Sequence, residues 1–243
     1  MNWYEEWFNT KEYLEIYKNR DDVEAETLAE LILSNIKIED SAKVLDMTAG
    51  AGRHAINFAR RGFNVTAVDL SKNLLKVAKE TASVYDFQID FVHSDIRKFE
   101  TSYKFDLVLN LFTSIGYFES DEENFELLRK AYNFLKPGGY FVLDYFNRNY
   151  LETNLVPNSV ETINGTIINQ NRTIQGNRVI KEIVIGKNGD TKKYFESVRM
   201  FSFDELQSEL ESTGFKINST FGDLDGKPFV LETSPRVIII ASK

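Results

Sequence analysis

Three aspartates with similar surroundings are the residues of this chain whose positions most clearly predict chemistry. Asp46 and Asp69 each end a short apolar run, and Asp95 follows a third run. Runs of this length and apolar content are typical of buried parallel strands. Because ligands of open α/β sheets bind at the carboxyl ends of the strands, three acids in this relative position predict one ligand site.

A loop of small residues follows the first of these acids. Gly50, Ala51 and Gly52 lead into a segment whose apolar residues have helical spacing. Glycines let the backbone approach a ligand closely, and the first N–H groups of a helix have no partner within it. Gly50-x-Gly52 fits a dinucleotide fingerprint loosely, but Asp46 would repel a pyrophosphate and attract a cationic amine. The pattern therefore favours a cationic ligand over a dinucleotide or an ordinary strand-to-helix turn.

The stretch from Asp46 to Gly52 resembles motif I of the class I S-adenosylmethionine (SAM) methyltransferases, whose ligand carries an ammonium and a sulfonium group. It departs from the commonest form of the motif at residues 47–49, which read MTA in place of LGC. The run NLFTSIGYF at residues 110–118 is similar to a run after strand 4 in one branch of this family, and LKPGG at residues 135–139 is a further landmark. Methyltransferases that act on DNA or protein glutamine carry Asn/Asp-Pro-Pro-Tyr/Phe after strand 4. This chain lacks that pattern, which counts against those substrates.

The resemblance implies how such a cofactor would be held. Asp46 and the glycine loop would bind the methionyl end, and Asp69 would accept from the two ribose hydroxyls. Asp95 would bond the adenine amino group, with Ile96 against the ring. The cofactor-binding residues that we predict are Tyr17, Arg20, Asp46, Gly50, Ala51, Gly52, Asp69, Leu70, Asp95, Ile96, Asn110 and Phe112.

The N-terminal segment is rich in aromatic side chains, among them Trp3, Trp7, Tyr13 and Tyr17. Spacings of four residues place such side chains on one helix face. The segment suits a helix that packs on the domain. It also suits a lid that closes over the cofactor, with Arg20 gripping a carboxylate.

No catalytic base is evident in the sequence. A nucleophile displaces the methyl group in line, and a neutral amine needs little acid–base help because proximity and orientation supply most of the acceleration. Tyr117, Tyr145 and Asn147 are the candidate catalytic residues. Phe112 and Tyr117 are also expected to wall the methyl-transfer pocket, since aromatic rings hold groups near a sulfonium.

The resemblance implies an α/β fold with a doubly wound, seven-stranded and mostly parallel sheet. Its strand order would be 3-2-1-4-5-7-6, with strand 7 antiparallel. Residues 1–150 and 201–243 would form the Rossmann-like SAM-binding domain with an N-terminal helical lid. Residues 151–200 instead have hairpin turns and strand patterns, which predict an inserted antiparallel β subdomain.

The insertion is the part of the chain from which we expect acceptor choice or homodimer contacts, because the main sheet is committed to the cofactor. Its polar candidates for these roles are Arg172, Tyr194 and Arg199. After the insertion, Ser202 and Glu205 have the spacing of a capping box at the start of a helix.

The composition excludes several classes of chemistry. The chain has 243 residues, a net charge of −8, no cysteine and two histidines. Disulfides and thiolate catalysis are therefore excluded, a metal site is not expected, and broad attraction to nucleic acid is not supported. No 18-residue apolar run or signal-peptide pattern occurs, so we expect no membrane partner and a cytoplasmic location.

Together these features predict a SAM-dependent methyltransferase that acts on a small molecule, with an amine as one option for the acceptor. One alternative is an NAD(P)-dependent oxidoreductase, against which Asp46 argues. Another alternative is a non-catalytic SAM-binding module that has kept only the cofactor site.

Overall fold

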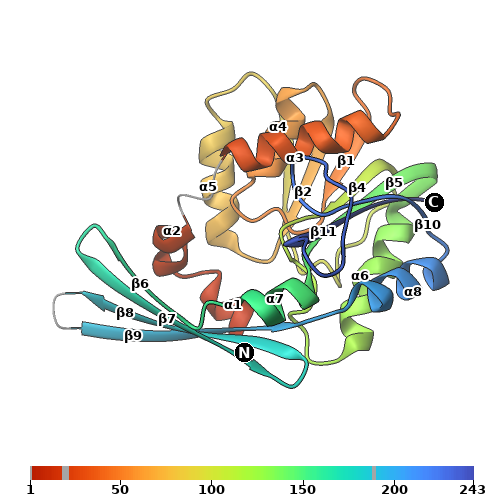
Figure 1. Ribbon diagram of the computed structural model, residues 1–243. Coiled ribbons are helices and arrows are strands. Elements are labelled where there is room, and N and C mark those ends of the chain that lie inside the picture. The colour runs from red at the N-terminus through yellow and green to blue at the C-terminus, as the bar shows by residue number, and fades with distance from the viewer. Residues whose placement is uncertain (1, 18–21, 188–189) are drawn as a thin grey trace.

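Seven strands form one continuous sheet in the described residues, which are 2–17, 22–187 and 190–243 of this computed structural model (Figure 1). In spatial order the strands are β3 (Ile89–His93), β2 (Asn64–Asp69), β1 (Lys43–Asp46), β4 (Phe105–Asn110), β5 (Leu135–Phe146), β11 (Arg236–Ser242) and β10 (Lys216–Phe221). β11 runs antiparallel to both of its neighbours, and the other pairs are parallel. The predicted strand order and the antiparallel last strand are confirmed.

Helices cover both faces of this sheet, so its central strands are apolar on both sides. The covering helices are α3 (Asp22–Asn35) and α4 (Arg53–Arg60) on one face, and α6 (Asp121–Phe134) and α8 (Phe203–Thr213) on the other. Because side chains alternate along a strand, Val44 packs with α3 and α4, whereas the next residue, Leu45, packs in the opposite core. A fifth helix, α5 (Lys72–Ala82), lies against β2 and β3. With both faces covered, the ends of the strands remain as the places for a ligand.

Local capping signals set the starts of the helices. Ser202 and Glu205 make both hydrogen bonds of a capping box at the start of α8, which confirms that prediction. Ser71 caps α5, its hydroxyl accepting from the N–H of Leu74 at 3.1 Å. Because Ser71 supplies this cap, the side chain of Asp69 is not required for it.

The chain leaves the main sheet after β5 through a short helix, α7 (Arg148–Asn154), which the sequence pattern did not predict. It then forms a separate antiparallel sheet, in the order β6 (Asn158–Ile163), β7 (Thr166–Gln175), β8 (Arg178–Lys187) and β9 (Asp190–Arg199). Figure 1 shows this second sheet below the main one, with the N-terminal helices beside it.

A third apolar cluster joins the N-terminal segment to this insertion. The segment forms two short helices, α1 (Trp3–Trp7) and α2 (Lys11–Tyr17). Trp7 and Tyr13 pack against Ile183 of β8, and the indole N–H of Trp7 donates to Glu196 of β9 at 2.8 Å. These contacts fix the aromatic segment between the insertion and the main sheet.

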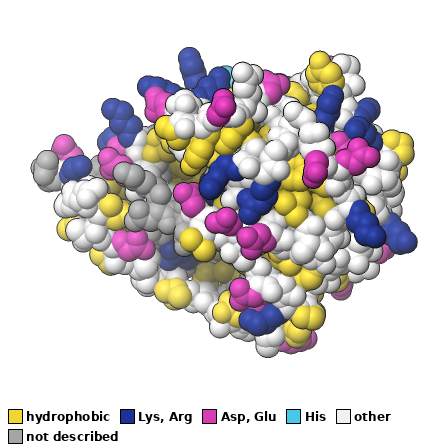
Figure 2. All heavy atoms as spheres, turned by 90° about the horizontal axis from the view of Figure 1, so that it is seen from above, with side chains coloured by type: hydrophobic (Ala, Val, Ile, Leu, Met, Phe, Trp, Pro, Cys, Tyr) yellow, Lys and Arg dark blue, Asp and Glu magenta, His cyan; other side chains and the backbone are white. Residues whose placement is uncertain are grey.

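The surface mixes both signs of charge. Seen from above, Lys and Arg side chains are interspersed with Asp and Glu side chains, and this face has no continuous basic field (Figure 2). It therefore offers little broad attraction to a polyanion. Among the described residues, none of the helices combines the length and the apolar character needed to cross a bilayer.

Candidate active site

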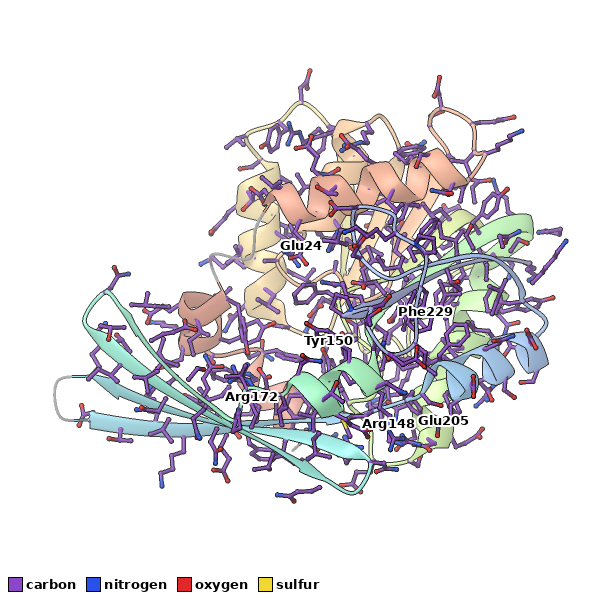
Figure 3. All side chains as sticks on the ribbon, viewed as in Figure 1. Glu24, Arg148, Tyr150, Arg172, Glu205 and Phe229 are labelled. Carbon is purple, nitrogen blue, oxygen red and sulfur yellow. The ribbon has the colours of Figure 1, made fainter. Side chains whose placement is uncertain are left out.

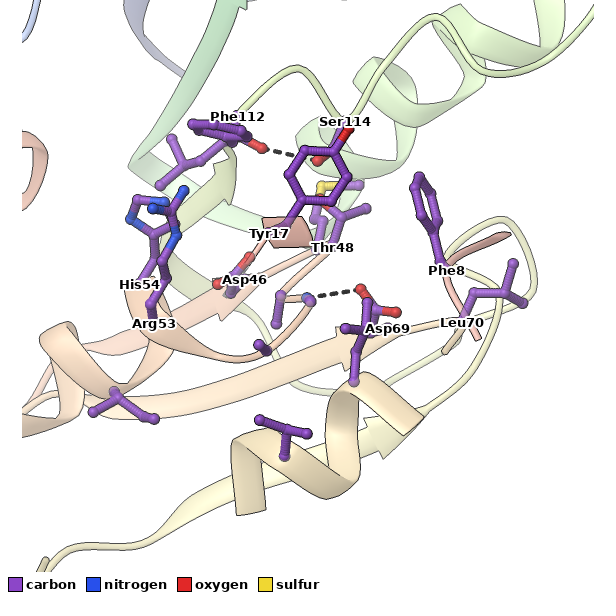
Figure 4. A pocket seen from close by; sticks show the side chains of 18 of the residues that line it. Phe8, Tyr17, Asp46, Thr48, Arg53, His54, Asp69, Leu70, Phe112 and Ser114 are labelled. Carbon is purple, nitrogen blue, oxygen red and sulfur yellow. Dashed lines mark hydrogen bonds between the residues drawn. The ribbon is translucent and has the colours of Figure 1, made fainter. Parts of the chain in front are cut away.

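A cavity of about 610 Å³ lies at the carboxyl ends of β1, β2 and β4, and Asp46, Asp69 and Asp95 all line it. Its volume is within the usual range for small-molecule sites. Figure 4 shows Asp46, Asp69 and the rings of Phe8 and Tyr17 arranged around this space. The structure thus brings the three predicted acids to one site.

The glycine loop is shaped by two different requirements. Gly52 has a φ of +81°, and a Cβ on it would lie 2.7 Å from Cβ of Ala78, so both backbone and packing require glycine. Gly50 has a φ of +57° and open space where its Cβ would be. The N–H of Gly50 donates to Oδ2 of Asp69 at 2.8 Å, and Oδ1 accepts from the N–H of Ser71 at 2.7 Å. Asp69 is therefore held rigidly at the cavity beside the loop.

Several buried polar atoms around the cavity have no hydrogen-bond partner among the described residues. They are Oδ2 of Asp46, Oγ1 of Thr48, both ring nitrogens of His54 and both amide atoms of Asn110. Leaving a buried polar group unpaired costs about 1–3 kcal/mol, and folded proteins rarely do so without a function. Asp46, Thr48 and His54 line the cavity. Together they are suited to a ligand with hydrogen-bond donors and a positive charge near Asp46.

The protonation of the site follows from its burial. Burial raises the pKa of Asp46 to about 7, and the nearby charge of Asp69 adds to the effect. Burial also raises the pKa of Asp69. For His54, burial and the positive charges of Arg53 and Arg236 lower the pKa to about 3. His54 is therefore a neutral hydrogen-bonding group at physiological pH, whereas a cationic ligand would stabilise the charged form of Asp46.

Phe112 is held at the cavity wall by an unusual backbone. Phe112 and Thr113 have left-handed φ angles of 59° and 58°, which are costly for non-glycine residues and typical of functional sites. The carboxylate of Asp144 accepts from the N–H of Phe112, and the Asp144 carbonyl accepts from the N–H of Thr113, each at 2.9 Å. The guanidinium carbons of Arg53 and Arg236 lie 4.7 and 5.3 Å from the centre of the Phe112 ring. The ring position is thus fixed by contacts on several sides.

A second cavity, of about 260 Å³, shares part of its wall with the first. Phe8, Tyr13, Phe112 and Tyr117 line both cavities. The rest of the second cavity is formed mainly by α7 and by β7, β8 and β9 of the insertion. We call these four aromatic side chains the aromatic boundary, because they lie between the two cavities. A reactant in each cavity could meet the other at this boundary.

Most of the predicted cofactor residues line the first cavity. These residues are Tyr17, Asp46, Gly50, Ala51, Asp69, Leu70, Asp95, Ile96 and Phe112. Gly52 and Asn110 are not part of the lining, but they adjoin it in the chain at the start of α4 and the end of β4. Arg20 lies outside the described residues.

Of the three catalytic candidates, Tyr117 lines the cavity and the other two do not. Tyr145 is fully buried and its hydroxyl donates to the carbonyl of Arg199, and burial raises its pKa. Asn147 caps α7, accepting from the N–H of Asn149 at 3.1 Å, and donates to two carbonyls of the β10–β11 connection. The structure therefore gives Tyr145 and Asn147 structural contacts and does not place them in the lining of either cavity.

The three polar candidates of the insertion have different surroundings. Arg172 lines the second cavity. Tyr194 packs on the Trp7 ring of α1, with ring centres 4.4 Å apart. Arg199 pairs with Asp121 at 3.0 Å and with Glu205 at 2.6 Å, so it ties β9 to the start of α6 and α8 instead of facing an acceptor.

Thr48 and His54 line the cavity but were not predicted from the sequence. Both flank the glycine loop, and polar side chains in that position are the signal that could have identified them. Phe8 and Tyr13 reach the cavity because α1 and α2 dock on the insertion, which no local pattern shows. Their aromatic character was visible in the sequence, but their partners were not.

The fold and the site define an α/β protein with a doubly wound sheet whose cavity at the carboxyl edge is lined by three aspartates. Comparison with known proteins narrows this class. Residues 44–139 match the family of the methyltransferase domain. Together with the seven-stranded sheet, these comparisons show a SAM-dependent methyltransferase with the class I fold.

Relatives and solved structures agree with this assignment. The chain is 26% identical over 215 residues to a Geobacillus sp. (strain WCH70) protein whose name places it among the methyltransferases, covering 84% of this chain and 86% of the relative. It is 22% identical over 212 residues to the dTDP-3-amino-3,4,6-trideoxy-alpha-D-glucopyranose N,N-dimethyltransferase of Streptomyces venezuelae, covering 84% and 87%. The CcbJ methyltransferase from Streptomyces caelestis has the same fold, with a TM-score of 0.82 at 17% identity over 98% of both chains.

Proposed function

We propose that this methyltransferase transfers the methyl group of SAM to the nitrogen of a small-molecule amine. The observation that carries the cofactor part of the proposal is the buried Oδ2 of Asp46, which has no hydrogen-bond partner among the described residues and lies in a cavity lined by two further aspartates. The methionyl ammonium of SAM would supply a hydrogen-bond donor and a positive charge beside Asp46, in addition to the nearby charge of Arg53. The Streptomyces venezuelae relative is named for an amino sugar nucleotide, which supports an amine as the acceptor.

The proposed cofactor contacts follow the order of the strands. Asp46 and the glycine loop hold the methionyl end, and Asp69 accepts from the ribose hydroxyls. Burial opposes the ionisation of Asp95, but hydrogen bonds from Arg97, one of them at 2.6 Å, lower its pKa. Asp95 is therefore an ionised acceptor suited to the amino group of an adenine, with Ile96 beside it against the ring.

A dinucleotide is a poorer fit to the same cavity. The N–H of Gly50, which would face a pyrophosphate in a dinucleotide site, donates to Asp69 instead. The cavity also presents Asp46 and Asp95. These carboxylates would repel an anion bound in the cavity, whereas they would attract a ligand with two positive centres.

Catalysis by this chain depends on how it positions the acceptor relative to the methyl group. When bound, SAM supplies a methyl carbon that its sulfonium activates toward a nucleophile. The four side chains of the aromatic boundary line both cavities, and aromatic rings favour cationic groups. A neutral amine brings its own lone pair, so the chain must orient it in line with the methyl carbon instead of removing a proton first. We therefore assign Tyr117 an orienting role.

Calorimetric titration of the purified chain with SAM, S-adenosylhomocysteine and NADH, side by side, tests the cofactor assignment. We expect the first two to bind with micromolar Kd, which is about −8 kcal/mol. NADH should give no heat of binding at the same concentrations. Binding of NADH alone would remove the basis for the proposal.

A transfer assay tests the acceptor. Labelled SAM is incubated with the chain and a panel of small amines, with the corresponding alcohols as controls. We expect labelled product from amines only. Product from alcohols alone would move the acceptor atom to oxygen, and SAM binding without transfer to any amine would indicate a non-catalytic SAM-binding module.

A further inference from the structure

Three charged residues form a row across the inner face of the insertion sheet. Arg172 of β7 pairs directly with Lys181 of β8, and Lys181 pairs directly with Glu196 of β9. Directly opposed residues of antiparallel strands share a face and interact. All three line the second cavity, and they are the charged residues of its lining among the described residues.

Glu196 is already occupied at one end of this row. Its carboxylate accepts from the indole N–H of Trp7 at 2.8 Å and from the hydroxyl of Tyr17 at 2.7 Å. It also pairs with Lys181 at 3.3 Å. The carboxylate of Glu196 therefore serves to neutralise Lys181 and to anchor the N-terminal helices.

Arg172 has a different environment at the other end. Within the described part of the chain, its guanidinium donates to neutral oxygens, namely the carbonyl of Val156 at 3.4 Å, Oγ of Ser159 at 3.1 Å and Oε1 of Gln170 at 2.5 Å. Its directly opposed neighbour, Lys181, has the same sign of charge, an arrangement that destabilises a sheet. Two positive side chains and one negative side chain leave the row with a net charge of +1 at the second cavity. The chain as a whole has a net charge of −8.

The position of Arg172 relative to the aromatic boundary would let its positive charge bind one end of an acceptor. Figure 3 shows Arg172 on the insertion sheet near α7, and the second cavity joins it to Phe112 and Tyr117. An acceptor in this cavity can therefore present one end to the first cavity and another end to Arg172. A guanidinium is the side chain best suited to bind a carboxylate or a phosphate, because its fork matches their oxygens.

We infer that the acceptor carries an anionic group, a carboxylate or a phosphate, which Arg172 binds while the acceptor amine lies at the aromatic boundary. The inference rests on the proposed function, because it describes the acceptor of that same methyl transfer. It adds a feature of the acceptor, a negative charge at a distance from its amine.

Calorimetry of the chain saturated with S-adenosylhomocysteine tests the inference without requiring turnover. Two matched pairs of amine probes are titrated: glycine against glycinamide, and glucosamine 6-phosphate against glucosamine. In the wild type we expect the anionic member of one pair to bind about tenfold more tightly than its neutral counterpart, equivalent to about 1.4 kcal/mol. In Arg172→Gln this preference should disappear. The pair that shows it distinguishes a carboxylate from a phosphate.

Arg148→Gln is the matched control. Arg148 lies on α7, pairs with Glu152 at 2.8 Å and is not part of the lining of either cavity (Figure 3). This variant should keep the full preference. Arg172→Lys keeps the charge but loses the fork, and should keep part of the preference. If Arg172 only held β6 in place, its variants would lower thermal stability without changing the ratio within a probe pair.

The outcomes separate the inference from the proposed function. Equal binding of both members of each pair by the wild type would overturn the inference, and so would an anion preference that survives in Arg172→Gln. A wild type that binds S-adenosylhomocysteine and prefers anionic probes, but methylates no amine, would support the subsite and refute the proposed function alone.

Discussion

Asp46 is the residue whose environment links protonation most directly to ligand binding. Burial raises its pKa to about 7 in the ligand-free protein, and only the charged form can pair with a ligand ammonium. We expect SAM affinity to fall about tenfold between about pH 8 and pH 6, as a proton occupies the carboxylate. Calorimetric Kd values at both pH values check this. Asp46→Asn should bind weakly at both, with little dependence on pH.

The same shift acts in the opposite direction on the stability of the ligand-free protein. The folded-state pKa of Asp46 is raised from an ordinary value of 3.8 to about 7. Between these values the folded chain holds a proton that the unfolded chain has lost, so the contribution of this group to stability falls as pH rises. The Tm of the wild type should therefore fall more steeply with pH in this range than the Tm of Asp46→Asn. Parallel curves would contradict the shift.

Asp69 gives a second test at the scale of one residue. Asp69→Ala should weaken SAM binding by about 1.5–3 kcal/mol, because the proposed ribose hydroxyls lose a charged acceptor. Asp90→Ala, at an exposed acid on the neighbouring strand β3, is the control and should leave the Kd unchanged. Unchanged affinity in Asp69→Ala would remove this residue from the proposed site.

At the scale of elements, the junction between the loop after β4 and the insertion is set by Gly116. A Cβ on Gly116, whose φ is +100°, would lie 2.8 Å from the carbonyl oxygen of Arg199. Gly138 has a φ of +78° but nothing within 4 Å of such a Cβ, so it isolates the backbone cost, about 1–2 kcal/mol. We expect Gly116→Ala to lower the free energy of unfolding by about 1–3 kcal/mol more than Gly138→Ala. Urea denaturation of both variants measures the difference, and equal losses would mean that the junction relaxes freely.

At the scale of the whole molecule, the first cavity joins the main sheet to the N-terminal helices. Phe8, Tyr13 and Tyr17 contribute to its lining together with the strand ends. S-adenosylhomocysteine at 100 times its Kd should stabilise the folded chain by about 2.7 kcal/mol, which is a rise in Tm of about 5–10 °C. Hydrogen exchange should slow in both α1 and α2. A Tm rise with no protection of these helices would mean that the N-terminal segment does not contact the ligand.

The sequence by itself was sufficient for the main sheet and for most of the predicted residues that line the first cavity. Asp46, Asp69 and Asp95 could be placed together because a parallel strand has a direction, and its carboxyl end is readable from a short apolar run. The Ser202–Glu205 capping box could also be predicted, because both of its residues lie within one helical turn. These features depend on residues that are near one another in the chain.

The tertiary structure decided the features that depend on distant segments. Tyr145 was predicted as a catalytic candidate, but the elements packed around the end of β5 bury its ring in the core. Arg172 has a role in the proposed acceptor site only because β7 folds against α7 and the aromatic boundary. Trp7 and Glu196, separated by 189 positions, meet because two apolar faces pack together. A local pattern shows that such a face exists, whereas the shape and burial of the whole chain select the face that it meets.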